Sequence, residues 1–325
     1  MQKALVTGCA GFIGSHLCER LVSENIQVVG LDSLNDYYSP RIKRANLEAL
    51  LGNPSFTFIE SDLLAFDLAP LVNSLDVVFH LAAQPGVRGS WGKNFSAYVD
   101  NNVMATQKLL EAAKNARGLQ KLVYASSSSV YGETRVAAVN EEHPTHPQSP
   151  YGATKLAAEH LCFLYQSNYG LPVTALRLFS VYGPRQRPDM AFTRLLHAGI
   201  TKKKFFLFGD GRQERDFTFV LDVVEAMILA ALNNGENGVY NIGGGHVFSM
   251  KNLIETAETL LGTKILVESR KSERGDVRRT SADITKSKQV LLFQPKYGTE
   301  EGLKRQIQYI RDHLDLYEEI GTSQQ

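Results

Sequence analysis

Residues 4–14 read ALVTGCAGFIG, a short apolar run followed by three evenly spaced glycines. The apolar run predicts a buried β-strand, and the apolar spacing after it predicts an amphipathic α-helix. Gly8, Gly11 and Gly14 give the turn backbone freedom and leave room for a ligand against the main chain. Phosphate groups bind at such turns because backbone N–H groups and the helix N-terminus point at them. The spacing is GxxGxxG rather than GxGxxG, and alone it does not distinguish a dinucleotide site from an ordinary turn.

Strand-like and helix-like segments alternate through the first half of the chain. Further β-rich runs cover residues 27–31, 56–59, 77–81, 121–125 and 172–178. Helical periodicity follows the glycine turn and returns at residues 99–113 and 151–169. This alternation predicts an α/β fold, with a Rossmann-type, doubly wound parallel sheet in residues 1–178. Residues 179–325 are predicted to form a smaller C-terminal α/β substrate lobe, from which some segments cross back to the sheet.

The composition argues against several classes of protein. The chain has 325 residues, 43% of them hydrophobic, and its 35 Lys and Arg residues nearly balance 34 Asp and Glu residues. This balance predicts no nucleic-acid surface, and no apolar run approaches the roughly 18 residues of a membrane helix. Cys9, Cys18 and Cys162 show no disulfide or zinc spacing, so no metal site is predicted. The N-terminus lacks the features of a signal peptide, so we expect a cytoplasmic protein.

An acidic residue follows the second predicted strand. Asp32 lies eighteen positions after Gly14, where a carboxylate accepts hydrogen bonds from the ribose hydroxyls of adenosine. A carboxylate there would repel a 2′-phosphate, so the position favours NAD over NADP. The competing interpretation is a turn aspartate. Asp62 and Leu63 follow the third predicted strand, and we expect them to flank the adenine.

A tyrosine and a lysine share one face of the helix predicted after Pro150. Tyr151 and Lys155 are four residues apart, which places them side by side on a helix. A phenol ordinarily titrates near pH 10, and a neighbouring ammonium group lowers its pKa toward that of a useful base. This pair is common on exposed helices. Here it follows a predicted strand that ends in Ser126–Ser129, at the edge where such sheets bind ligands.

Five segments occur in the order Thr7–Gly14, His80–Ala83, Ser126–Gly132, Tyr151–Lys155 and Arg215–Phe217. Together they resemble the extended short-chain dehydrogenase/reductase family, specifically its nucleotide-sugar epimerases and dehydratases. The resemblance extends from the N-terminus to about residue 302. It implies NAD bound by the first lobe and a nucleotide sugar bound by the second. The implied NAD-binding residues are Gly8, Gly11, Phe12, Ile13, Gly14, Asp32, Asp62, Leu63, Leu81, Ala82, Ala83, Tyr151 and Lys155.

The resemblance also implies three catalytic residues. Tyr151 would remove a proton from the substrate hydroxyl while NAD accepts a hydride from the same carbon. Ser127, four residues before Tyr131, would hydrogen-bond the oxygen that is oxidised. Lys155 would bind the nicotinamide ribose and lower the pKa of Tyr151. Return of the hydride to the opposite face of a rotated 4-keto intermediate gives the C4 epimer, and NAD is recycled.

Two serines follow Ser127. Dehydratases that resemble this chain carry an Asp-Glu pair there, and related uronate decarboxylases carry Glu at the second position. Ser128 and Ser129 add no carboxylate, so they argue against a dehydratase. Their neutral hydroxyls also suit a sugar that carries a carboxylate. Ser180 stands where UDP-glucose epimerases usually carry Asn. We hypothesise that the hydroxyls of Ser128, Ser129 and Ser180 hold the sugar carboxylate in a geometry that resists its loss as carbon dioxide.

Three further segments, residues 30–38, 84–88 and 187–191, resemble UDP-glucuronate 4-epimerases. The resemblance implies conversion of UDP-glucuronate to UDP-galacturonate. Three enzymatic alternatives stay open: a UDP-glucose 4-epimerase, a UDP-N-acetylhexosamine 4-epimerase and a UDP-glucuronate decarboxylase. A non-catalytic NAD-sensing or RNA-associated protein of the same fold is a fourth.

The resemblance also suggests contacts for the rest of the substrate. It matches Arg215 to a phosphate-binding arginine, adds Arg187 as a second candidate, and places Asp276 near the uridine ribose. Arg88 is a further candidate for the UDP-sugar. The family implies a homodimer in which the helices at residues 99–113 and 151–169 form a four-helix bundle with their partner copies.

Overall fold

The computed structural model describes residues 1–134, 136–233, 237–271 and 277–318. Within these residues the main sheet has seven strands in the order β11-β6-β5-β4-β1-β2-β3, and every neighbouring pair is parallel. This arrangement confirms the predicted doubly wound parallel sheet. The strands are β1 (Lys3–Thr7), β2 (Gln27–Asp32), β3 (Phe56–Glu60), β4 (Val77–His80), β5 (Lys121–Ser127), β6 (Val173–Leu178) and β11 (Gly238–Ile242).

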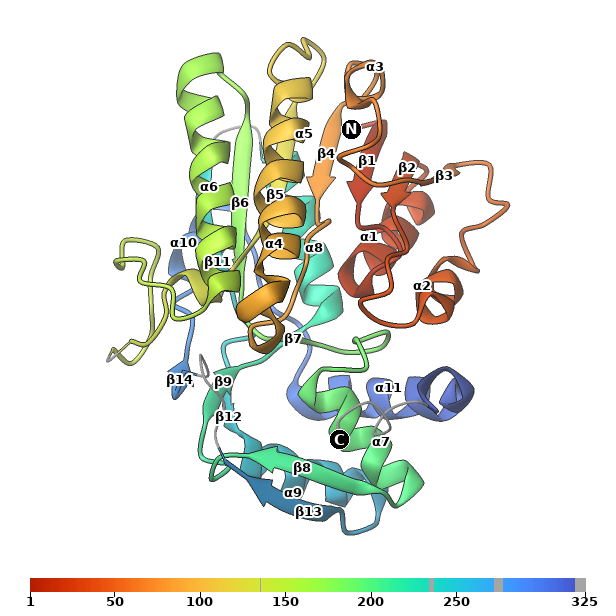
Figure 1. Ribbon diagram of the computed structural model, residues 1–325, viewed down its shortest axis with the longest axis vertical. Helices are drawn as coiled ribbons and strands as arrows, with labels where there is room; N and C mark the ends of the chain where they lie inside the picture. The colour runs from red at the N-terminus through yellow and green to blue at the C-terminus, as the bar shows by residue number, and fades with distance from the viewer. Residues whose placement is uncertain (135, 234–236, 272–276, 319–325) are drawn as a thin grey trace.

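Side chains alternate between the two faces of the sheet, as a pleated strand requires. On β4, Val78 packs into the core on one face, and Val77 and Phe79 pack into the core on the other. Figure 1 shows α5 and α6 in front of the sheet and α1 and α8 behind it. These helices and their neighbours are α1 (Phe12–Ser23), α2 (Pro40–Leu47), α3 (Leu68–Val72), α4 (Phe95–Tyr98), α5 (Ala105–Ala113), α6 (Pro150–Tyr169) and α8 (Val220–Leu232).

The helix predicted over residues 99–113 is not uniform. Val99–Met104 is a π-helical segment, and the regular helix α5 begins only at Ala105. Asn102 lies in the π segment, where its side chain accepts a hydrogen bond from the Gln84 backbone N–H at 2.7 Å and donates one to Thr154 Oγ1 at 3.0 Å. A π segment often marks a functional site, and this one connects the loop after β4 to α6.

The smaller lobe lies at the carboxyl end of the sheet (Figure 1). It contains two-stranded and three-stranded sheets with helices packed against them. Strand β11 and helix α8 come from beyond residue 178, but β11 is part of the main sheet and α8 shares a core with it. The elements of the lobe are β7 (Val181–Tyr182), α7 (Ala191–Thr201), β8 (Lys204–Phe208), β9 (Glu214–Asp216), β10 (Thr218–Phe219), β12 (Val247–Ser249), α9 (Met250–Leu261), β13 (Leu266–Arg270), β14 (Arg279–Thr280), α10 (Thr285–Val290) and α11 (Thr299–Asp312).

None of the helices in the described part of the chain combines the length and the apolar character that a membrane crossing requires.

Replacing Gly14 with alanine tests the turn that connects β1 to α1. An added Cβ at this position would overlap the carbonyl oxygen of Gly8, which is backbone and cannot rotate away. We expect Gly14→Ala to lower the free energy of unfolding by about 1–3 kcal/mol, as overpacking does, measured by urea denaturation. At Gly118 a Cβ would meet only one atom, at 3.9 Å. Gly118→Ala is therefore the control, and an equal loss in both variants would contradict this account of the turn.

Candidate active site

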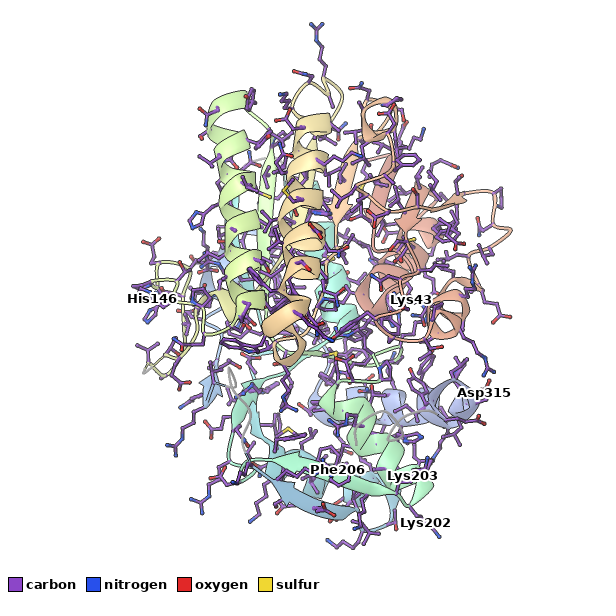
Figure 2. The ribbon with its side chains drawn as sticks, in the orientation of Figure 1. Lys43, His146, Lys202, Lys203, Phe206 and Asp315 are labelled. Carbon is purple, nitrogen blue, oxygen red and sulfur yellow. The ribbon has the colours of Figure 1, made fainter. Side chains whose placement is uncertain are left out.

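A cleft of about 760 Å³ lies at the carboxyl ends of the parallel strands, between the sheet and the smaller lobe. This is where open α/β sheets bind ligands, at the point where the strand order reverses between β1 and β4. Lys43 on α2 and Phe206 on β8 both line the cleft and come from the two different lobes (Figure 2). The volume is within the ordinary range of small-molecule sites.

The glycine turn forms one end of the cleft. Gly8 has a φ of +74°, which favours glycine, and its backbone N–H donates to Leu31 O at 2.8 Å. Helix α1 begins after Gly11, with no side-chain hydrogen bond capping its first turn. Gly11, Ile13 and Gly14 line the cleft, and the uncapped N-terminus of α1 suits an anion. The turn therefore fits the pyrophosphate of a dinucleotide.

Asp32 lies at the end of β2, next to this turn. Its carboxylate accepts backbone hydrogen bonds from Ala10 at 3.1 Å and from Leu34 at 2.9 Å. Burial raises the pKa of Asp32, and these N–H groups and the charge of Lys43 oppose the increase. Each carboxylate oxygen has a second lone pair, so Asp32 retains acceptor capacity toward the cleft. That capacity fits a ribose diol.

Tyr151 lies in the first turn of α6, whose N-cap Ser149 accepts a hydrogen bond from the Gly152 N–H at 3.1 Å. Burial raises the pKa of Tyr151, while a hydrogen bond with Ser127 and the charge of Arg187 lower it. Ser127 ends β5, and its Oγ also accepts a hydrogen bond from the Ser129 N–H at 3.1 Å. The structure thus brings a phenol and a hydroxyl from separate elements into one hydrogen-bonded pair.

Lys155 is buried one helical turn beyond Tyr151. Its Nζ lies 4.4 Å from the centroid of the Tyr124 ring on β5. Burial lowers the pKa of Lys155 to about 7, although the nearby Cys162 and Glu159 act in the opposite direction. His80 on β4 has its pKa lowered to about 3, by burial and then by the charge of Lys155. His80 is therefore neutral near pH 7, and Lys155 titrates close to that pH.

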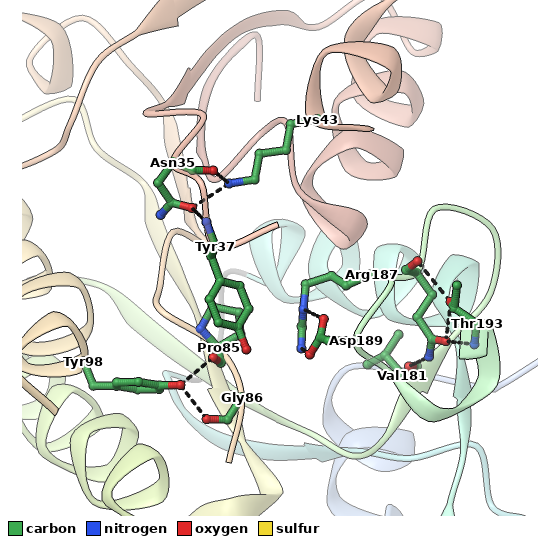
Figure 3. Close-up of polar contacts among 11 residues, drawn as sticks. Asn35, Tyr37, Lys43, Pro85, Gly86, Tyr98, Val181, Arg187, Asp189 and Thr193 are labelled. Atoms are coloured by element: carbon green, nitrogen blue, oxygen red, sulfur yellow. Dashed lines mark hydrogen bonds and ion pairs between the residues drawn. The ribbon is translucent and has the colours of Figure 1, made fainter. Parts of the chain in front are cut away.

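The loop after β4 is fixed by Tyr98. The Tyr98 hydroxyl lies 2.9 Å from Pro85 O and 2.8 Å from Gly86 O, in position to donate to either (Figure 3). The ring of Tyr98 packs edge-on against Tyr151, with 6.3 Å between centroids. Gly86 has a φ of +101°, and a Cβ there would collide with the hydroxyl of Tyr37. One buried side chain therefore supports both a loop of the cleft and the ring of Tyr151.

Arginines from both lobes line the cleft. Arg187 forms a bidentate ion pair with Asp189, at 2.9 and 3.0 Å (Figure 3). Arg88, from the larger lobe, places its guanidinium 4.2 Å from the centroid of the Phe208 ring in the smaller lobe. Arg215 on β9 donates to Glu214 O at 2.9 Å and lines the same cleft. These side chains suit an anionic group that lies between the lobes.

The cleft brings together nearly all of the residues that the sequence nominated. Asp276 lies outside the described residues, so its predicted place near the uridine ribose stays a prediction. The nominated residues that line the cleft are Gly8, Gly11, Phe12, Ile13, Gly14, Asp32, Asp62, Leu63, Leu81, Ala82, Ala83, Arg88, Ser127, Ser128, Ser129, Tyr151, Lys155, Ser180, Arg187 and Arg215.

Sequence reasoning missed several residues of the cleft and its support. Tyr37, Arg194 and Phe206 line it, and Tyr98 and Asn102 support its loop and helix from behind. Tyr37 lies within residues 30–38, a segment singled out for its resemblance but not searched for individual contacts. Arg194 carries no local signal, because a single arginine on an amphipathic helix looks like a solvated residue. In the described part of the chain no group of three His, Cys, Asp or Glu side chains is arranged to hold a metal ion.

The sequence profile of the family described as GDP-mannose 4,6 dehydratase matches residues 5–306. The chain belongs to the GDP-mannose 4,6 dehydratase family. This membership confirms the resemblance to the extended short-chain dehydrogenases/reductases that the motifs indicated.

Several known proteins are similar to this chain, and they carry different names. UDP-glucuronic acid 4-epimerase from Bacillus cereus, crystallised with UDP-glucuronic acid and NAD, has a TM-score of 0.93 at 44% identity, covering 95% of this chain and 99% of that chain. A UDP-glucuronate 4-epimerase from Thermodesulfobacterium geofontis is 39% identical over 98% of this chain and 99% of its own length. A Bacillus subtilis protein described as an uncharacterized UDP-glucose epimerase is 45% identical over 95% of this chain and 98% of its own length.

The burial of Lys155 predicts a pH-dependent stability. Unfolded lysine titrates near pH 10.4 and folded Lys155 near 7, so between these values the unfolded chain binds more protons. The contribution of this group to folding stability therefore rises from about pH 7 to about pH 10. We expect the free energy of unfolding of Lys155→Met to exceed that of wild type by roughly 2–4 kcal/mol near pH 7. It would be measured by urea denaturation of the nucleotide-free protein. The difference should shrink toward pH 10, and parallel stability curves would contradict the prediction.

Proposed function

We propose that this protein is an NAD-dependent isomerase that interconverts UDP-glucuronate and UDP-galacturonate by epimerisation at C4. The first support comes from the residues around Tyr151. They bear on the choice between epimerisation and dehydration, because the family takes its name from a dehydratase. The proposal is supported further by the 44% identity to a protein crystallised with UDP-glucuronic acid and NAD.

The observation that carries the proposal is that the described cleft lining places no unpaired acidic side chain beside Tyr151. Among the described residues that line the cleft, the acids are Asp32, Asp62 and Asp189. Asp32 and Asp62 follow β2 and β3 at the end that fits adenosine, and Asp189 is already paired with Arg187. Elimination of water from a 4-keto sugar needs an additional acid and base. The neutral hydroxyls near Tyr151 instead suit proton removal at C4 beside a sugar carboxylate.

The charge of the cleft supports a ligand with several negative groups. The described lining carries six cationic side chains against the three acids named above. Burial lowers the pKa of Arg194, and the charges of Arg88 and Arg270 lower it further. A bound diphosphate would relieve this mutual repulsion. The six cations are Lys43, Arg88, Lys155, Arg187, Arg194 and Arg215.

In the proposed reaction the residues divide the work. Tyr151, as the phenolate, takes the proton of the sugar 4-hydroxyl, and Ser127 donates a hydrogen bond to the oxygen as it becomes a carbonyl. Lys155 would stabilise the phenolate and would hold the ribose of the nicotinamide when NAD is bound. NAD, when bound, supplies the hydride acceptor and donor. Rotation of the 4-keto sugar would turn the opposite face of C4 toward the cofactor for return of the hydride, and Tyr151 would return the proton to the 4-oxygen.

Each end of the cleft has a proposed ligand. Residues 1–178 would hold NAD, with the pyrophosphate on the glycine turn, and residues 179–325 would hold most of the UDP. Phe206, whose ring packs under the guanidinium of Arg270 at 3.6 Å, would stack on the uracil. Ser128, Ser129 and Ser180 would hold the carboxylate of the sugar. We also propose a cytoplasmic location, which the buried and unpaired state of all three cysteines supports.

The proposal predicts the products of one reaction and the effect of one substitution. Proton NMR of the protein with UDP-glucuronate and NAD should show UDP-galacturonate, with neither a UDP-pentose nor accumulated NADH. Loss of the general base in Tyr151→Phe should lower kcat by about 10²–10⁴. Binding of UDP-glucuronate, measured by calorimetry, should be retained, since Tyr151 acts on a single hydroxyl.

Other products would identify a different reaction. A UDP-pentose from wild type would mean decarboxylation, and turnover of UDP-glucose or UDP-N-acetylglucosamine alone would move the activity to a neutral sugar. The double variant Ser128→Ala/Ser129→Ala tests the carboxylate site. If it binds UDP-glucuronate as wild type does and forms no UDP-pentose, the role proposed for these serines is wrong.

We further propose a homodimer through α5 and α6. The two helices lie side by side in front of the sheet (Figure 1). Met104, directly before α5, and Leu164, on α6, are 49% and 55% exposed. Pairing with a second copy through a four-helix bundle would cover both side chains.

Light scattering tests the oligomer directly. We expect wild type to have the mass of a dimer and Leu164→Arg to shift toward the monomer at micromolar concentration. The substitution is at an exposed position, so its effect on the unfolding of one subunit should stay within about 0.5 kcal/mol. A monomeric wild type would end the dimer proposal.

A further inference from the structure

A buried ion pair lies behind the active site and outside the cleft lining. Arg177 on β6 donates from Nη2 to Glu159 Oε1 at 2.6 Å and from Nε to Oε2 at 3.1 Å. The two side chains are only 7% and 4% exposed. A bidentate guanidinium–carboxylate pair fixes orientation as well as distance. This pair therefore sets how α6 lies on β6.

The pair also reaches the strand that ends in the catalytic serine. Glu159 is four residues after Lys155 and eight after Tyr151, so all three share a face of α6. Ser126, directly before that serine on β5, donates from Oγ to Glu159 Oε2 at 2.5 Å. Ser126 and Arg177 are register partners across β5 and β6. One carboxylate thus connects the helix of the proposed base to both strands beneath it.

A second layer of hydrogen bonds holds Arg177 from the other side. Its Nη1 donates to the Tyr131 hydroxyl at 2.8 Å and to Glu141 O at 3.3 Å. The Tyr131 hydroxyl donates in turn to Asn241 Oδ1 on β11 at 2.7 Å, and Asn241 Nδ2 donates to Val139 O at 2.8 Å. The guanidinium therefore has two further partners, and one of them, Tyr131, is itself held by β11.

Stability alone does not explain this arrangement. A buried ion pair loses so much hydration that apolar residues of the same volume often stabilise a protein as well or better. We propose that Glu159 and Arg177 are positioning residues, which hold α6 on β5 so that Tyr151 meets Ser127. The reaction used to test this rests on the proposed function, whereas the geometry does not.

The pair also affects the charge around the proposed base. The ionisable groups that face Tyr151 and Lys155 come from every neighbouring element. Glu159 is the acid among them, and removing its charge leaves Arg177 uncompensated. The Tyr151–Lys155 pair would then lose its first proton at lower pH. The facing groups are His80 on β4, Tyr98 on α4, Tyr124 on β5, Glu159 and Cys162 on α6, Arg177 on β6 behind Glu159, and Arg187 on the loop before α7.

Replacing Glu159 separates positioning from a merely structural role. We expect Glu159→Gln to lower kcat by about 10- to 100-fold, since small misplacements of a reacting group have effects of this size. KM should change less than about threefold, because neither Glu159 nor Arg177 lines the cleft. The acid limb of the kcat profile should move to lower pH. The neutral double variant Glu159→Gln/Arg177→Gln should restore the acid limb but not kcat.

A buried carboxylate elsewhere provides the control. Asp222 on α8 is 1% exposed and accepts hydrogen bonds from the backbone N–H groups of Lys296 at 2.8 Å and Tyr297 at 3.3 Å. Asp222→Asn should lower Tm and leave kcat and the acid limb unchanged. If Glu159→Gln behaves in the same way, with only Tm affected, the positioning role is wrong.

Two further measurements keep the test decisive. If Glu159→Gln does not fold, Ser126→Ala takes its place, because it removes only one hydroxyl of the network. It should lower kcat by about 3- to 10-fold with little change in Tm. An unchanged kcat overturns the proposal. If wild type does not convert UDP-glucuronate, the proposed function has failed separately. The tyrosinate titration of Tyr151, taken as the ultraviolet difference from Tyr151→Phe, then decides. Glu159→Gln must move it to lower pH, and an unmoved titration overturns the proposal.

Discussion

The parallel direction of all strands in the main sheet is the constraint on which the active site depends. Because every neighbouring pair is parallel, the loops and helices that follow the strands all begin at one edge. The glycine turn after β1, Asp32 at the end of β2 and Ser127 at the end of β5 meet there although they are far apart in sequence. The smaller lobe closes this edge from the other side, so that the cleft has a wall from each lobe.

The chemistry proposed for this edge depends on burying charge. The pKa of Lys155 falls because its ammonium group has left water, and the aromatic ring of Tyr124 and the carboxylate of Glu159 compensate only in part. Arg187 keeps its charge because Asp189 pairs with it directly. Charges held away from water act strongly on one another. In the proposed reaction, charges held in this way would stabilise the phenolate of Tyr151 and attract a diphosphate.

Local sequence patterns were sufficient for every strand of the main sheet except β11. Residues 121–125 are short, apolar and β-rich, and they lie between two predicted helices, so their place in a parallel sheet follows from chain order. Strand β11 escaped prediction, because its short run of residues 238–242 is isolated from any βαβ repeat. The π segment at Val99–Met104 escaped for another reason, since its hydrogen bonds shift by one residue without changing the helical periodicity that a sequence shows.

The sequence by itself determined the class of fold, the dinucleotide turn and the pairing of Tyr151 with Lys155, because each depends on residues close together in the chain. Only the tertiary structure decided which distant side chains share the cleft. It brought Tyr98 against Tyr151, placed Arg88 on Phe208 from the opposite lobe, and connected Glu159 to Arg177. Such contacts join strands and helices that are far apart in the sequence. Their geometry is set by sheet register and helix packing, which no local pattern of residues encodes.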